Sequence, residues 1–219
     1  MDLSTFTPAS ALVTVVLLAL APFVAVMVTS FTKLVVVLSL LRNAMGLQQV
    51  PPNVVMNGLA LILSLYVMYP VGVEMQDRLA ELPTQGKAST TQMMAAADVA
   101  KEPLREFLLK HSRPLERAFF LKTAQRSLKP EQAQALTERD FLVVVPAFTV
   151  SELTVAFEIG FLIFLPFLVI DLVIANILMA MGMQMLSPTT VSLPFKLLLF
   201  VLIDGWVKLT HGLVLTYQT

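Results

Sequence analysis

The 219-residue sequence contains no cysteine. Disulfide bridges, thiolate zinc sites and cysteine-ligated iron–sulfur clusters are therefore excluded. Histidine is almost as scarce, since His111 and His211 are the only two and stand a hundred residues apart. We expect isolated structural or surface histidines rather than a metal pair, and we predict that the protein holds no cofactor and no metal.

Sequence motifs for catalysis are also missing. The chain has no P-loop, no GxGxxG, no HExxH and no GxSxG. Glu152 and Glu158 are close in sequence, but a separation of six residues puts them about 240° apart around a helix. Basic and acidic residues balance at fifteen each, without an aromatic-rich basic patch, so nucleic acid is not an expected partner. We predict a protein that is not an enzyme.

Hydrophobic residues are what this chain has in abundance. They make up 57% of the sequence, and the mean hydropathy is +0.79. An ordinary soluble domain is less apolar than this, so the composition places the chain among membrane proteins.

The apolar residues are concentrated in segments long enough to cross a membrane, which takes roughly 20 residues. An unbroken helix over residues 11–41 would be about 46 Å long, too long for a hydrocarbon core of about 30 Å. We therefore expect the chain to kink, tilt or leave the bilayer there. The four apolar segments are residues 11–28, 54–73, 153–181 and 193–217.

A hydrophilic insert separates the second apolar segment from the third. Residues 74–140 hold 11 of the 15 basic and 10 of the 15 acidic residues. Apolar residues at helical spacing predict three or four short amphipathic helices, and Pro103, Pro114 and Pro130 each suit a first helical turn.

The predicted fold is thus an all-α membrane protein in three regions. Residues 1–73 carry apolar segments 1 and 2, residues 74–140 form the helical insert, and residues 141–219 carry apolar segments 3 and 4 with a methionine-rich loop. Some of the four segments are expected to be broken or hairpin-like.

The charges next to the first segments predict an orientation. Lys33 and Arg42 lie in the connection of residues 29–53, which favours the cytoplasm for that loop. With four crossings, both termini and the insert then lie outside, on the side of the membrane away from the cytoplasm. No lysine or arginine precedes the first apolar run, so we expect no cleaved secretory signal.

The last two apolar segments contain ionisable residues that lipid would not tolerate. A charge near mid-bilayer costs about 2.5 kcal/mol or more. We therefore predict that these charges lie inside an assembly, where opposite charges within a subunit or between copies neutralise them. For Glu152 and Lys196, at the segment ends, the alternative is that they simply reach the membrane interface. The other candidate buried charges are Glu158, Asp171, Asp204 and Lys208.

Methionine recurs at every second position from Met179 to Met185. On a helix this spacing would wrap around the cylinder without forming a packing stripe. Gly182 and Pro188 predict that the helix ends here. Flexible thioethers suit either a surface that adapts to many partners or an apolar pore constriction, and equally a packed helix end. The residues alone leave these interpretations open.

Three stretches of this chain resemble the FliP/SctR (YscR) family of type III secretion systems. They are TSFTKLVVVLSLLRNAMGLQQVPPN, VPAFTVSELTVAFEIGFLIFLPFLVIDLVIANILMAMGMQMLSP and SLPFKLLLFVLIDGW. The resemblance implies a pore-forming subunit of the export apparatus, which conducts unfolded proteins across the bacterial inner membrane. It implies a location within the basal body, partly periplasmic. It also implies a homopentamer assembled with SctS/FliQ-type and SctT/FliR-type membrane subunits.

The same resemblance implies roles for particular residues. A channel gasket falls on Met183, Gln184 and Met185, where Gln184 departs from the methionine common in the family. An ion pair between subunits falls on Glu152 of VSEL and Lys196 of LPFK. Because the chain is short and lacks a cleavable signal, it resembles the injectisome branch, which serves virulence.

Two other functions remain as alternatives. One is a small secondary transporter or ion channel that uses Asp171 and Asp204 as an intramembrane relay. Transporters of this kind tend to contain internal repeats, and none is evident in this sequence. The other is a purely structural membrane scaffold.

Overall fold

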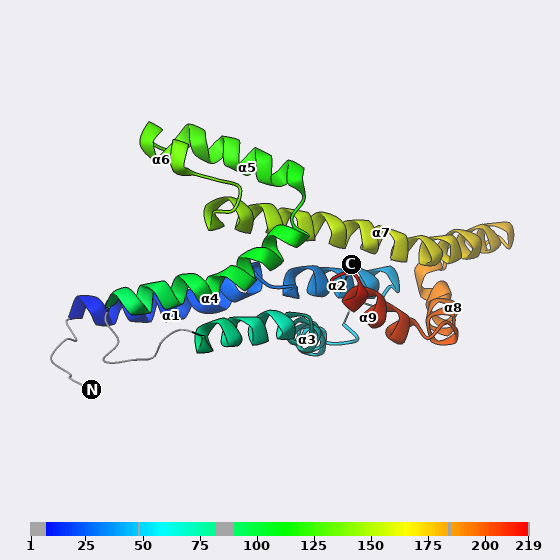
Figure 1. Cartoon of the computed structure of the whole chain (residues 1–219). Helices are drawn as coiled ribbons and strands as arrows, with labels where there is room; N and C mark the ends of the chain where they lie inside the picture. Colours follow the sequence, from blue (N-terminus) through cyan, green and yellow to red (C-terminus); the bar gives the residue numbers. More distant parts are fainter. Residues whose placement is uncertain (1–7, 48, 82–89, 184, 219) are drawn as a thin grey trace.

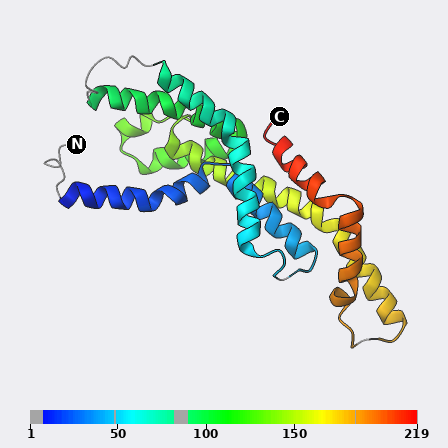
Figure 2. The same cartoon turned by 90° about the horizontal axis from the view of Figure 1, so that it is seen from below.

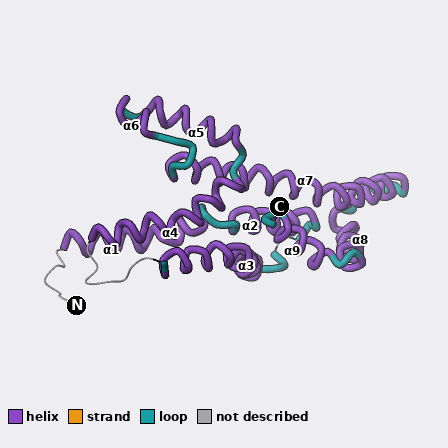
Figure 3. Tube along the Cα trace, viewed as in Figure 1, coloured by secondary structure: helices purple, strands orange, loops and turns teal. Residues whose placement is uncertain are grey.

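A computed structural model describes residues 8–47, 49–81, 90–183 and 185–218, and this part of the chain forms nine α-helices and no strand (Figures 1 and 3). The predicted all-α fold is confirmed. In chain order the helices are α1 (Pro8–Met27), α2 (Phe31–Ala44), α3 (Asn53–Ala80), α4 (Thr90–His111), α5 (Pro114–Ser127), α6 (Pro130–Ala135), α7 (Phe141–Ala180), α8 (Pro188–Leu202) and α9 (Gly205–Leu215).

The short helix α2 lies at the centre of the packing. Its apolar residues recur at helical spacing on one face and are at most 1% exposed. That face packs against α3 and α7, and further along the helix against α8. These residues are Leu34, Val37, Leu38 and Leu41.

The longest element is α7, with 40 residues. Pro146 and Pro166 lie inside it without ending it. At 1.5 Å per residue it is about 60 Å long, roughly twice the thickness of a hydrocarbon core. It approaches α2 closely at Gly160, where an added Cβ would lie 2.2 Å from Cδ1 of Leu40. The absence of a side chain at this glycine therefore permits the contact between the two helices.

Two helices, α3 and α7, are each long and apolar enough to cross a membrane, and two bent helix pairs raise the possible number to four. Helix α2 turns by 67° from the last half of α1, so the long first apolar stretch is broken as expected. The second pair, α8 and α9, bends by 61° at Asp204. The φ angle of Asp204 is +53°, the left-handed conformation that ends one helix before the next begins.

The hydrophilic insert folds into helices that pack on the apolar ones. Helix α4 packs on α3 and α7, while α5 packs on α7 and carries α6 at its far end (Figures 1 and 2). Pro114 and Pro130 begin α5 and α6 as predicted. Helix α3 runs on to Ala80, past the predicted boundary at residue 73, and the division into three regions stays a prediction.

The expectation for Pro103 is wrong, because this residue lies inside α4. Helix α4 already begins at Thr90. The preceding run TTQMMAAADVAKE is rich in alanine, methionine and other strong helix formers. Their propensity starts the helix well before the proline, which then costs the helix a backbone hydrogen bond in its interior.

Candidate functional site

The methionine-rich stretch forms a turn at the tip of a helical hairpin. Helix α7 ends at Ala180, and the chain reverses through Gly182, whose φ is +72°. The N–H of Gly182 donates to the carbonyl of Met179 at 3.0 Å, and the N–H of Met183 donates to the carbonyl of Leu178 at 2.9 Å. These two bonds form the cap that glycine typically allows at a helix end. The helix end predicted from Gly182 and Pro188 is thus where the sequence placed it.

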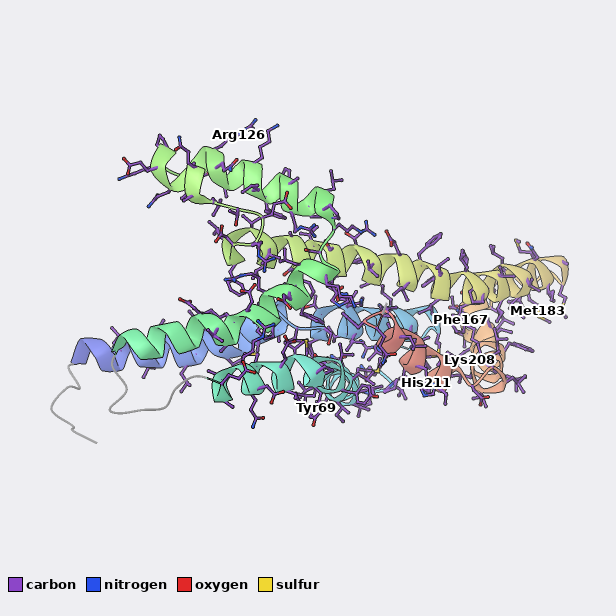
Figure 4. All side chains as sticks on the ribbon, in the orientation of Figure 1. Tyr69, Arg126, Phe167, Met183, Lys208 and His211 are labelled. Carbon is purple, nitrogen blue, oxygen red and sulfur yellow. The ribbon has the colours of Figure 1, made fainter. Side chains whose placement is uncertain are left out.

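The thioethers of this turn are exposed. Met185 is 99% exposed and Met183 is 43% exposed. Met183 lies at the far end of α7, away from the rest of the molecule (Figure 4). Gln184, the third residue of the predicted gasket, lies outside the described residues. Within one chain, nothing that is described packs Met185 into a core, so the tip has apolar side chains available for a neighbour or a lumen.

A polar cluster ties the two arms of this hairpin together. The ammonium of Lys196 on α8 lies 2.6 Å from Oδ2 of Asp171 on α7 and donates to the carbonyl of Ala44 at 3.1 Å. The hydroxyl of Ser192, one turn earlier on α8, donates to Oδ1 of Asp171. Lys196 is 3% exposed and Ser192 is fully buried. The predicted neutralisation of Asp171 thus comes from Lys196 of the same chain.

A second polar cluster joins α2, α7 and the residues after α9. The ammonium of Lys33 lies 3.2 Å from Oε1 of Glu152, and both side chains are at most 3% exposed. The phenol of Tyr217 donates to the other oxygen of Glu152, and its ring lies under the ammonium of Lys33 at 3.5 Å. Two helices and the end of a third are therefore held by one buried carboxylate.

The periphery of this second cluster reaches α3 and α4. The hydroxyl of Ser30, which precedes α2, donates to the hydroxyl of Ser64 on α3 at 3.0 Å. The ring of His111, at the end of α4, stacks edge-on against Tyr217 with ring centroids 5.0 Å apart. Burial, with the positive charges of Lys33 and Lys110, lowers the pKa of His111 to about 4. His111 is thus a neutral structural residue.

The structure gives Glu152 and Lys196 separate partners within the chain. Glu152 pairs with Lys33 and Lys196 with Asp171. Neither residue reaches a surface, so the alternative of side chains extended to the interface does not describe them. A contact between Glu152 of one copy and Lys196 of the next stays a prediction.

The other three candidate buried charges are exposed on the single chain. Glu158 is paired with Arg113 of the insert, 2.7 Å away. Asp204 lies at the bend between α8 and α9. Lys208 lies one turn later, on α9 (Figure 4). Burial of these three residues would require a neighbouring molecule. Asp171 is paired with Lys196, and no hydrogen bond or ion pair among the described residues joins Asp171 to Asp204.

Sequence reasoning missed Lys33 and Tyr217 as members of a site. Lys33 served only as an orientation signal, although a single lysine between apolar runs is itself a sign of a buried partner. No local pattern identifies Tyr217. Among the described residues there is no group of three or more histidine and acidic side chains that could hold a metal ion.

Comparisons with known proteins extend over almost the whole chain. The sequence model of the FliP family matches residues 13–213. The chain is 55% identical to the hypersensitivity response secretion protein HrcR of Ralstonia nicotianae, over 96% of this chain and 97% of that protein. It is 55% identical to the Yop proteins translocation protein R of Yersinia pestis, over 92% of each. The virulence protein YscR of Salmonella typhimurium is 48% identical over 87% of each.

Proposed function

Because the chain belongs to the FliP family, and to its injectisome-type members, we propose that it is a pore-forming core subunit of a type III protein secretion export apparatus. In this proposal the assembled subunits conduct unfolded proteins across the bacterial inner membrane. The secretion and translocation named in the relatives' descriptions support it. In this proposal the protein is a component of the apparatus and does not itself act as an enzyme.

The observation that carries the proposal is the exposed methionine tip. Met185 is 99% exposed at the end of the hairpin, so its apolar side chain contributes no burial to the stability of a single chain. Repeated around a ring, the same side chains would close an apolar constriction that excludes water and ions. Thioethers also adapt their shape, so they can deform around a passing chain of any sequence. In this proposal Met183, Gln184 and Met185 form the gasket.

Partners are part of the same proposal. An apolar groove of about 420 Å³ opens between α2, α7, α8 and α9, with Lys208 as its charged lining residue. Such a surface is unusual for a monomer, and it supports an assembly in which neighbouring subunits cover it. We propose a homopentamer that also binds SctS/FliQ-type and SctT/FliR-type subunits. It sits in the inner membrane within the basal body, with the insert in the periplasm.

The proposal is tested by the permeability of the assembled oligomer. Replacing Met183 and Met185 by alanine removes thioethers from the ring, so leakage of small ions through the reconstituted complex should rise while assembly is retained. Met75→Ala, on α3 and far along the chain from the tip, is the matched control and should leave leakage unchanged. Unchanged permeability in a double variant that still assembles would contradict the proposed lining.

A further inference from the structure

Helices α7 and α8 leave the methionine tip as two arms (Figure 2), and a salt bridge joins them well behind the tip. Asp171 precedes the end of α7 by nine residues, and Lys196 follows the start of α8 by eight. The salt bridge between them therefore closes the hairpin about two turns behind the turn that carries Met183 and Met185.

Apolar packing contributes to how α8 lies along α7. Phe167 and Phe200 meet behind the salt bridge with ring centroids 6.5 Å apart, at a tilt of 44°. An aromatic pair accepts a range of distances and tilts, so it defines the register of two helices less sharply than a hydrogen bond between two atoms does. Hydrogen bonds to a charged group are directional and roughly twice as strong as neutral ones. The polar cluster is thus the element that can define the register of the hairpin.

The polar cluster also connects the hairpin to a third helix, α2. Ala44 is the last residue of α2, and its carbonyl is among those that an α-helix leaves without a partner in its own last turn. Lys196 donates to this carbonyl at 3.1 Å. A cation at a helix C-terminus is also favoured by the helix dipole. The ammonium of Lys196 therefore connects α8 both to α7 and to the C-terminal end of α2.

We propose that Asp171, Ser192 and Lys196 are positioning residues for the methionine tip. They hold α8 in register against α7 and the end of α2, and so they set where Met183 and Met185 stand relative to the body of the molecule. This inference rests on the proposed function only for its consequence in the pore. The positioning itself is a property of the hairpin.

The test uses the absence of cysteine from the chain. A single cysteine at Thr190, exposed in the first turn of α8, carries a spin label on the assembled oligomer. Asp171→Asn removes the charge while keeping the shape of the side chain, and Ser192→Ala removes the second bond to the same carboxylate. Ser192→Thr keeps the hydroxyl and is the rescue variant. Glu158→Gln is the matched control, because it removes another ion pair of α7, one that is exposed.

If the cluster positions the tip, Asp171→Asn and Ser192→Ala mobilise the label and raise ion leakage while the oligomer keeps its size. Loss of one charge-assisted hydrogen bond corresponds to a roughly tenfold larger population of displaced tips. Ser192→Thr and Glu158→Gln leave both readouts unchanged.

Two other results would overturn the positioning role, and a third would separate it from the proposed pore lining. An immobile label in both variants overturns the proposal, and so does loss of the oligomer in both, since the cluster would then be only structural. A mobile label without leakage, together with unchanged leakage in the Met183 and Met185 alanine variant, supports the positioning role and overturns the pore lining instead.

Discussion

At the scale of single residues, Lys33 and Glu152 form the most completely buried ion pair among the described residues. Glu152→Gln leaves the ammonium of Lys33 without its counter-charge in an apolar core. Removing one partner of a buried pair costs about 3–5 kcal/mol. We expect a correspondingly lower melting temperature of the detergent-solubilised oligomer, followed by scanning calorimetry or fluorescence.

Two double variants identify the true partner of Glu152. Adding Lys33→Met to Glu152→Gln removes the stranded charge, so much of the lost stability should return. Adding Lys196→Met instead should lower stability further, because Asp171 then loses its own partner. If stability instead returned only in the double variant of Glu152→Gln with Lys196→Met, the result would favour the pairing between copies that the family resemblance implies.

His111 makes stability depend on pH. The folded state holds the pKa of His111 at about 4, mainly through burial, whereas the unfolded chain titrates near 6.5. The unfolded state therefore binds more protons between these values. This contribution to stability is complete above pH 6.5 and is lost as the pH falls from about 6.5 towards 4.

We accordingly expect the melting temperature to fall between about pH 7.5 and about pH 5, and His111→Gln to reduce that difference. His211 is exposed on α9, so His211→Gln is the control and should leave the difference as it is. An equal pH response in all three proteins would show that other groups are responsible.

At the scale of elements, the contact between α2 and α7 depends on Gly160. Gly160→Ala places a methyl group 2.2 Å from Cδ1 of Leu40, and the two helices must separate or Leu40 must change rotamer. Overpacking of this kind typically costs about 1–3 kcal/mol. Gly72→Ala on α3 meets nothing within 4 Å and should instead be neutral or stabilising, by up to about 1 kcal/mol. Thermal unfolding of both variants is the measurement, and a similar loss in both would argue against the close approach.

The elements also mark how far the sequence could predict the structure. Helix breaks follow in part from local chemistry, so Gly182 and Pro188 marked the tip and the start of α8. The apolar run from residue 153 did not mark the start of α7 at Phe141, and the run of residues 193–217 is divided into α8 and α9 at Asp204. The expectation for Pro103 is wrong because the strong helix formers that precede this proline start α4 at Thr90. The partner of Glu152 was out of reach, since Lys33 lies 119 residues away in the chain and only tertiary packing brings the two together.

At the scale of the whole molecule, much apolar surface is left uncovered by the chain itself. Only 11% of the most apolar stretch of α7 is buried within the chain. Lys208 lies on the apolar helix α9 and Asp204 lies at the bend before it. If lipid surrounded this region in a single chain, each charge near mid-bilayer would cost about 2.5 kcal/mol or more. We expect native mass spectrometry to find a closed multimer, alone or with partner subunits. A stable monomer in mild detergent would contradict this.

Helix α7 carries the methionine tip on a short free arm. From Glu152 to Ala180 the helix rises about 42 Å, but Gly160 packs on α2 and Asp171 is tied through Lys196 to the end of α2. Only the nine residues after Asp171, about 14 Å of helix, extend beyond these contacts with α2. A rotation of about 15° at Asp171 moves the end of this arm by about 4 Å. In the proposed pore, an aperture ringed by several such arms would change its diameter by about twice that amount when all of them tilt together.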